Sequence, residues 1–342
     1  MIRKLGALLF ITVLLGAGAL FEVDRRWQQP LRLPAEGQIL SVKAGESLRS
    51  VAQGLSSAGI LTDPKLLILY ARWTGADQKI KRGEYLLKPP LGQEELLSLL
   101  QLGQVVQYGI TLPEGITVKQ ALELIGGNEA LNHLLEGEDD PRLAEIILPY
   151  SNPEGLFFPD TYYFARGSSD IELLTRAHTR MIQVLEEEWQ DRASELPFES
   201  PYEALIMASI IEKETGLAEE RGEISGVFAR RMQRGMRLQT DPTVIYGLGE
   251  SFDGNLRRSD LRDDSNRYNT YQIRGLPPTP IALSGREAIR AAVNPEPGTT
   301  LYFVARGDGG HVFSDTLSEH QAAVRRYQLQ RREDYRSSPD RS

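Results

Sequence analysis

The chain has 342 residues, of which 41% are hydrophobic and 25% are charged, and its formal net charge is −8. This composition is typical of a globular protein with two or three domains, and the acidic balance argues against a general nucleic-acid binder, which would carry a basic face. The lack of cysteine excludes disulfides, a thiol nucleophile and a thiolate metal site. The four histidines have no spacing typical of metal ligands, so we expect no metal site.

The N-terminus carries an apolar segment. Leu5 to Phe21 is uncharged and spans about 17 residues, the short end of what a membrane-spanning helix needs. Arg3 and Lys4 precede it, which predicts a cytoplasmic N-terminus and an exported remainder. Ala17-Gly18-Ala19 could also be a signal-peptide cleavage site, but the apolar run is longer than an ordinary signal core. We therefore favour an uncleaved membrane anchor over residues 1–24.

A small module follows a short linker. Residues 25–38 are polar and contain two prolines, which predicts the linker. Over residues 39–104 the pattern predicts a strand, two helices, a return strand and a third amphipathic helix. Gly45 is predicted to turn the chain and Ser47 to cap the first helix. This order resembles the LysM glycan-binding module, and a small α+β packing domain without a ligand is the alternative.

Residues 105–332 are predicted to form a larger mixed α+β domain, and residues 333–342 a disordered tail. The aromatic stretch Pro153–Phe164 predicts an ordered loop. Its aromatic side chains either fill the core, which we favour, or stack on sugar rings. The predicted fold class is thus α+β, with an N-terminal transmembrane helix, a LysM-like module and a larger catalytic domain.

The most informative stretch is a helix predicted to begin after Ser200. Ser200 and Glu203 form a capping box, and Pro201 takes the first helical position. Gly216 is predicted to be a left-handed stop. The residues between are apolar on nearly every side, as in a helix buried inside a domain.

Two carboxylates, Glu212 and Glu214, fall in the last turn of that predicted helix. The negative end of the helix dipole and desolvation both favour their protonated forms. A carboxylic acid that stays neutral near pH 7 is what a general acid needs. The alternative is a structural ion pair with Lys213 or Arg221, since such pairs also perturb acids.

Four separated motifs resemble those of one family. They are ASIIEKET over Ala208–Thr215, LQTDPTVIYG over Leu238–Gly247, YNTY with GLPP over Tyr268–Pro278, and YFV with GHVF between Tyr302 and Phe313. In this order they are similar to the MltG (YceG-like) family of endolytic murein transglycosylases, and the likeness covers nearly the whole chain.

The resemblance implies an enzyme of the inner membrane whose catalytic domain lies in the periplasm. Such enzymes cut the β-1,4 bond between N-acetylmuramic acid and N-acetylglucosamine within glycan strands, leave 1,6-anhydro ends and terminate nascent strands. It implies that Glu214 is the catalytic acid, with Glu212 the less favoured candidate, and that no cofactor is needed. The implied partners are peptidoglycan glycan strands and peptidoglycan synthases, with no nucleic acid.

Five further side chains are predicted to line the substrate cleft, with a fold-stabilising role as the alternative for each: Gln239, Asp241, Tyr246, Asn269 and Tyr271. Two other functions stay open. A hydrolytic muramidase would need a second carboxylate, for which Asp160, Asp241 and Glu212 are candidates. A non-catalytic wall-binding scaffold would need no acid at all.

Overall fold

The computed structural model describes residues 2–329, with side chains from Phe10 onward, and divides them into two compact units. Unit 1 contains the chain up to Tyr108 together with Tyr163–Ser168, and unit 2 contains Gly109–Tyr162 and the chain from Ser169. Helices combine with two-stranded sheets, which confirms the mixed α+β class. The predicted tail, 333–342, lies outside the described residues, and the predicted domain boundaries stay predictions.

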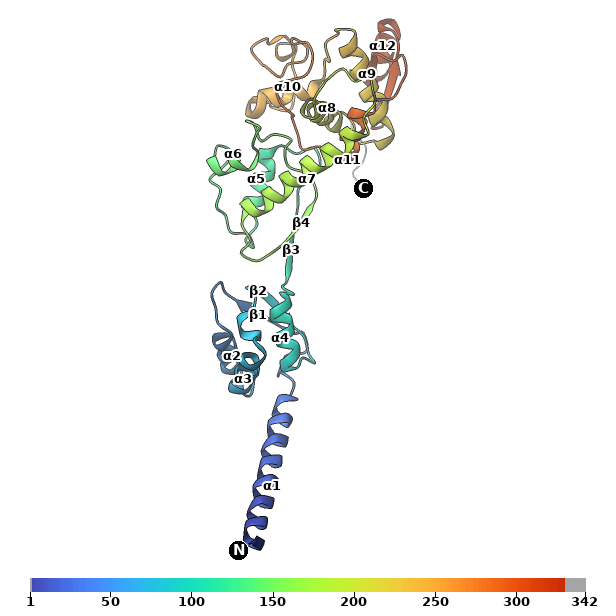
Figure 1. The fold of residues 1–342 in the computed structure, drawn as a ribbon. Helices are drawn as coiled ribbons and strands as arrows, with labels where there is room; N and C mark the ends of the chain where they lie inside the picture. Colours follow the sequence, from blue (N-terminus) through green and yellow to red (C-terminus); the bar gives the residue numbers. More distant parts are fainter. Residues whose placement is uncertain (1, 330–342) are drawn as a thin grey trace. The chain divides into compact units, whose positions relative to one another are not determined.

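Unit 1 begins with helix α1, Ile2–Trp27 (Figure 1). The Trp27 ring lies 4.2 Å from that of Tyr70, and the carbonyl oxygens of Arg26 and Trp27 accept hydrogen bonds of 3.1 and 3.3 Å from Gln93 Nε2. These contacts tie the end of α1 to the small module. Where side chains are described, no helix is both long and apolar enough to cross a bilayer, so the predicted membrane anchor is not confirmed.

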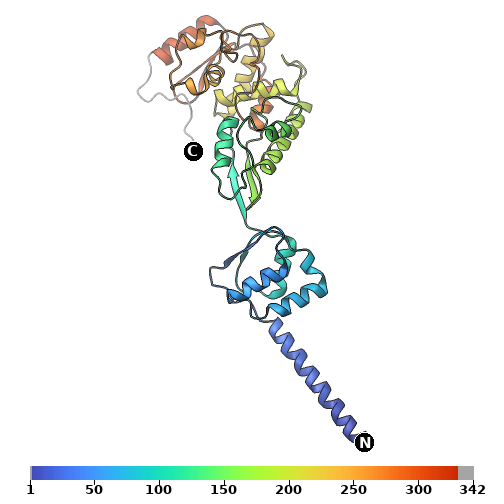
Figure 2. The same ribbon diagram turned by 90° about the vertical axis from the view of Figure 1, so that its left-hand side faces the viewer.

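The small module is built on one antiparallel pair. Strand β1, Gln38–Val42, pairs with β2, Gly83–Leu87, and Val42 lies opposite Gly83. Three helices are grouped with this pair in both views (Figures 1 and 2): α2, Leu48–Ser57, α3, Pro64–Thr74, and α4, Gln93–Leu102. The predicted succession of strands and helices is therefore confirmed for this part of the chain.

Local signals explain why the first helix of the module forms where it does. Gly45 has a φ of +75°, a conformation that costs glycine little, and it turns the chain out of β1. Ser47 Oγ then accepts a hydrogen bond of 3.2 Å from Ser50 N and caps α2. One face of α2 enters the core, with Leu48, Val51, Ala52 and Leu55 all buried.

Strands β3, Gln107–Thr111, and β4, Thr161–Ala165, form a second pair, and the division between the units falls within them. Unit 2 then contains eight further named helices and one hairpin among the described residues. The helices are α5 (Val118–Gly126), α6 (Pro141–Ile146), α7 (Asp170–Gln190), α8 (Pro201–Glu214), α9 (Arg221–Gln233), α10 (Asp241–Leu248), α11 (Arg286–Val293) and α12 (Leu317–Val324). The hairpin consists of β5 (Tyr302–Ala305) and β6 (His311–Ser314).

Helix α8 lies at the centre of unit 2. It contacts α7, α9, α10 and above all α11, which also packs on α7 and α9 (Figure 1). The predicted aromatic loop contributes to the same core, because Leu156 and Phe157 are fully buried and Phe158 is 8% exposed. The core interpretation of that loop is thus confirmed. Most of its rings are buried, whereas Tyr163 is 62% exposed.

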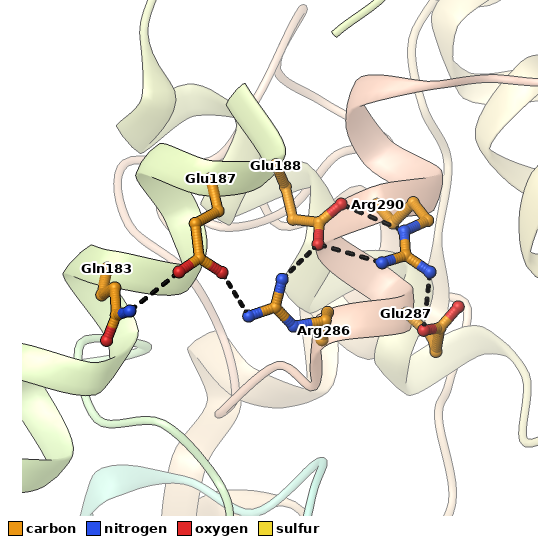
Figure 3. A network of polar contacts seen from close by, with 6 residues as sticks. All are labelled: Gln183, Glu187, Glu188, Arg286, Glu287 and Arg290. Atoms are coloured by element: carbon orange, nitrogen blue, oxygen red, sulfur yellow. Dashed lines mark hydrogen bonds and ion pairs between the residues drawn. The ribbon is translucent and has the colours of Figure 1, made fainter. Parts of the chain in front are cut away.

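Helices α7 and α11 are also joined by a cluster of charged side chains (Figure 3). Glu188 is buried and accepts hydrogen bonds from Arg286 Nη1 at 2.6 Å and from Arg290 Nε and Nη2 at 3.1 and 3.2 Å. Glu187 accepts from Arg286 Nη2 at 2.5 Å, but its side chain is 44% exposed. Burial alone would raise the pKa of Glu188. The hydrogen bonds from Arg290 and Arg286 outweigh it and hold that pKa below its ordinary value.

We expect Glu188→Gln to lower the free energy of unfolding by about 1–2 kcal/mol at pH 7, because it removes charge-assisted hydrogen bonds whose arginine partners are partly exposed. Denaturant unfolding of the full chain measures the loss. Glu187→Gln is the matched control, since its more exposed ion pair should contribute about 0–1 kcal/mol. Equal losses for the two variants would contradict the assigned role of Glu188.

Candidate active site

Helix α8 forms as its sequence predicts at one end and differently at the other. Ser200 Oγ accepts from Glu203 N at 3.3 Å, Glu203 Oε2 accepts from Ser200 N at 3.2 Å, and every residue from Ala204 to Ile211 is buried. The predicted left-handed stop at Gly216 is wrong, because the helix ends at Glu214 and Thr215 is extended, with φ −141° and ψ 138°. Thr215 Oγ1 accepts from Leu217 N at 3.0 Å, and the turn that this bond closes contains Gly216.

Glu214 is therefore the last residue of a buried helix. Its side chain is half-buried, and its Oε1 accepts a hydrogen bond from the hydroxyl of the buried Thr240. Desolvation raises the pKa of Glu214 to about 7, and the neighbouring Asp241 acts in the same direction. Thr240 and Arg231 oppose that shift only in part. The carboxyl group is thus partly protonated near neutral pH, as a general acid should be.

Glu214 faces a cleft of about 710 Å³ within unit 2, a size common for ligand sites. Segments from α8 through α12 contribute to its walls. Besides Glu214, the lining residues are Arg231, Leu238, Gln239, Thr240, Asp241, Tyr271, Phe303, Val304, Ala305, His311, His320, Val324 and Gln328.

Three of the five predicted cleft residues lie in this cleft. Tyr271 donates its hydroxyl to Asp241 Oδ1 at 2.7 Å, and burial together with Asp241 raises the pKa of Tyr271. Gln239 has a φ of +55°, and among the described residues no other non-glycine side chain sits on a positive φ. Strained backbone of this kind is concentrated at functional sites.

Tyr246 and Asn269 do not line the cleft, which corrects the prediction for both. The chain forms helix α10 from Asp241 onward, and five residues along a helix rotate a side chain by about 140°. Tyr246 consequently lines a different cavity, of about 350 Å³, and donates to Glu154 Oε2 at 3.1 Å. Asn269 is fully buried and holds a loop, donating to the carbonyl oxygens of Asp260 and Asp263 at 3.0 and 2.8 Å.

The competing acid, Glu212, has a structural environment. Its side chain is 6% exposed, its Oε2 accepts from Gly285 N at 3.1 Å, and its Oε1 lies 3.7 Å from Arg221 Nη2. Burial raises its pKa, yet the residue does not line the cleft. Asp160 is exposed and also lies outside the lining, so Asp241 is the one candidate for a second carboxylate that shares the described cleft with Glu214.

Several cleft residues were not predicted from the sequence. Arg231 is buried, and it donates from Nε to Leu301 O at 2.7 Å and from Nη1 to Leu238 O at 2.7 Å. His311 and His320 also line the cleft, although their sequence spacing is not that of metal ligands. The available signal for His311 was its position just after a glycine-rich hairpin turn. Across the described residues, no three side chains are grouped as metal ligands would be.

The raised pKa of Glu214 predicts how activity depends on pH. With Glu214 as the general acid, we expect kcat/KM to fall about tenfold per pH unit above pH 7. Burial also raises the pKa of Glu154 to about 7, so the profile should be measured for Glu154→Gln as well. If Glu154→Gln shows the same fall in kcat/KM above pH 7, that fall is assigned to Glu214. A profile that stays level to pH 9 in both proteins would contradict the assignment.

Comparison with known proteins decides the family. The model of the YceG-like family matches residues 40–326, which is most of the chain. The chain belongs to the YceG-like family. This membership agrees with the resemblance noted for the four motifs, and the match covers most of the small module and every lining residue of the cleft except Gln328.

Curated relatives of this YceG-like chain carry one name. It is 29% identical over 306 residues to an endolytic murein transglycosylase of Bacillus subtilis, covering 84% of each chain. It is 26% identical over 354 residues to an endolytic murein transglycosylase of Streptococcus pneumoniae, covering 92% of this chain and 63% of that protein. A crystal structure of a yceG-like protein from Listeria monocytogenes aligns with a TM-score of 0.55 at 28% identity, covering 84% of this chain and 99% of the other.

Proposed function

We propose that this YceG-like protein is an endolytic murein transglycosylase. It cleaves the β-1,4 bond between N-acetylmuramic acid and N-acetylglucosamine inside glycan strands and leaves 1,6-anhydro ends, which terminates strand elongation. The observation that carries the proposal is Glu214, an acid with a pKa of about 7 at the wall of a large cleft. The family and the names of the relatives support the same reaction.

Glu214 serves both steps of the reaction. In its protonated form it gives the proton to the glycosidic oxygen, and the bond between that oxygen and C1 of the muramoyl unit breaks with its electron pair on the leaving oxygen. The acetamido group of the substrate stabilises the positive centre at C1, as in substrate-assisted glycosidases. Glu214, now ionised, takes the proton of the C6 hydroxyl while O6 bonds to C1. The acid is thereby regenerated, and no water is consumed.

The neighbours of Glu214 fit this double role. Thr240 donates to Oε1, which leaves Oε2 for the substrate. A donor on one oxygen stabilises the ionised state that must exist between the two steps, while burial keeps the resting state protonated. An intermediate pKa suits a group that first gives and then takes a proton.

Hydrolysis is the alternative reaction, and Asp241 is the residue that could support it. A muramidase needs a second carboxylate, about 5–5.5 Å away if retaining or about 6.5–9.5 Å if inverting. Asp241 shares the described cleft with Glu214, but its Oδ1 accepts the hydroxyl of Tyr271. This hydrogen bond occupies only Oδ1, so the nature of the product decides between attack by water and attack by the C6 hydroxyl.

Product analysis tests the proposal directly. The purified full chain in detergent is incubated with peptidoglycan, and the soluble and residual glycan are examined by mass spectrometry. Transglycosylation predicts 1,6-anhydro ends, whereas hydrolysis predicts reducing ends. A chain that releases neither would instead be the wall-binding scaffold considered above.

We further propose that the protein resides at the cytoplasmic membrane with its catalytic unit on the periplasmic side. The apolar run Leu5–Phe21 after Arg3 and Lys4 supports this location, and part of that run precedes the first described side chain. The small module is proposed to bind glycan as LysM modules do, on the strength of its order of strands and helices. Peptidoglycan synthases are the proposed partners, since strand termination must follow synthesis. Membrane fractionation and protease accessibility of the full chain test the location.

A further inference from the structure

A hairpin brings one histidine to the wall of the cleft. Strands β5 and β6 pair antiparallel with His311 opposite Ala305, and both residues line the cleft. The turn between the strands is fixed by Gly307 and Gly309, with φ of +94° and +92°. A Cβ at Gly310 would lie 2.9 Å from Glu220 Oε1. The backbone before His311 is therefore pressed against Glu220.

Glu220 holds His311 with both of its oxygen atoms. Oε1 accepts from His311 N at 2.8 Å, and Oε2 lies 2.7 Å from His311 Nδ1. Oε2 also accepts the hydroxyl of Thr215 at 3.3 Å. Because an ionised carboxylate only accepts, Nδ1 carries the proton in this pair. The side chains of His311 and Glu220 are only 7% and 12% exposed, so the imidazole is fixed in orientation.

Because Glu220 binds Nδ1, Nε2 of His311 is left to bind a ligand in the cleft. No hydrogen-bond partner for Nε2 is found among the described residues. The edge-to-face contact with Phe303, at 5.3 Å and 90°, holds the ring in place. With the proton on Nδ1, the neutral ring carries its lone pair on Nε2 and can accept a hydroxyl proton. An acceptor that lines a polar cleft and has no hydrogen-bond partner among the described residues can bind a substrate hydroxyl.

We infer that His311 is a second substrate-contacting residue, whose Nε2 accepts a hydrogen bond from a glycan hydroxyl beside the bond that Glu214 cleaves, and that Glu220 is its positioning residue. The inference rests on the proposed function. Thr215, which follows Glu214 directly, shares Glu220 with His311. The Glu220 carboxylate thus holds both Thr215, at the end of helix α8, and the imidazole of His311. It thereby fixes the position of that imidazole relative to the end of the helix that carries Glu214.

Two substitutions separate contact with substrate from support of the fold. An asparagine at position 311 can place a donor where Nδ1 lies and keep the bond to Glu220, but it has nothing at the position of Nε2. Glutamine reaches the position of Nε2. We expect H311N to lower kcat/KM about 10–100-fold, the usual range for a lost hydrogen bond to substrate, and H311Q to retain activity within about fivefold of wild type. Full activity of H311N would overturn the inference.

A binding measurement keeps the test decisive if H311N folds poorly. In the Glu214→Gln background, labelling the four histidines with nitrogen-15 allows the Nε2 resonance of His311 to be followed as uncrosslinked glycan strands are added. A shift confined to that resonance supports the contact, and no shift at saturating glycan refutes it. If the wild-type chain produces no anhydro ends, the proposed function fails. If wild type is active and the His311 measurements are negative, only this inference fails.

Discussion

Replacing Glu214 with glutamine is expected to reduce kcat/KM for glycan cleavage by on the order of 10²–10⁴-fold, the usual contribution of a general acid–base group. Glutamine keeps the shape of the side chain and an oxygen that can accept the hydroxyl of Thr240, but it cannot give a proton. The formation of 1,6-anhydro ends, followed by mass spectrometry under single-turnover conditions, measures the loss.

Glu212→Gln is the matched control for that experiment. Glu212 lies two residues earlier in the same helix and is also buried, but it accepts from Gly285 N outside the cleft. We expect the control to stay within about threefold of wild type, because an amide oxygen can still accept that hydrogen bond. Comparable losses in both variants, or an active Glu214→Gln, would contradict the assignment.

Stability provides a second check on the Glu214 variant. The pKa of Glu214 rises from 4.5 to about 7 in the folded chain, so folding favours the protonated form. The stability that this carboxyl contributes is fully present below pH 4.5 and is lost as the pH rises to about 7. Above that pH the ionised group opposes folding, so Glu214→Gln should unfold at the same or a higher temperature than wild type. An inactive but destabilised variant would point to a structural role.

Gly155→Ala is expected to lower the free energy of unfolding by about 2–4 kcal/mol, the largest stability effect predicted for this chain. Gly155 has a φ of +77°, a conformation that costs any other residue energy. A Cβ there would also lie 2.7 Å from Cγ of Pro280 and closer still to its Cβ. The aromatic loop would have to move away from the loop that carries Tyr271. Denaturant unfolding of the full chain measures the change.

Gly275→Ala separates the two costs. Gly275 has a φ of +78°, nearly that of Gly155, but a Cβ there would meet nothing within 4 Å. This control should lose only the backbone contribution, about 1–2 kcal/mol. The difference between the variants reports the clash with Pro280. If both lose the same amount, the close approach of the two loops does not contribute to stability.

Patterns confined to neighbouring residues predicted the elements well. The capping box at Ser200 and the apolar run after it placed helix α8, and the glycine and serine at 45 and 47 placed α2, because a cap is a contact between residues three apart. The end of α8 could not be predicted in this way. Thr215 stops that helix with a side chain that also bonds to Glu220, and Glu220 is held in turn by a distant hairpin.

The residues of the site, like the helices, could be predicted only where the signal was local. Glu214 was singled out because its place in the helix predicts a perturbed acid, and the raised pKa agrees with that reasoning. Tyr246 was misplaced because the polar stretch around Asp241 forms a helix, which turns the tyrosine to another cavity. Arg231 and His311 were missed since nothing in their local sequence shows that the chain returns to Glu214.

The walls of the cleft are drawn from widely separated parts of the chain, with Glu214 on one side and residues from Phe303 to Gln328 on another. Synthesis from the N-terminus reaches Glu214 well before it reaches the hairpin and helix α12 that line the same cleft. A nascent or proteolytically clipped chain that stops short of Phe303 can present the acid without the surface that grips a polysaccharide. We expect a chain that ends before Phe303 to contain Glu214 but to lack this part of the cleft lining.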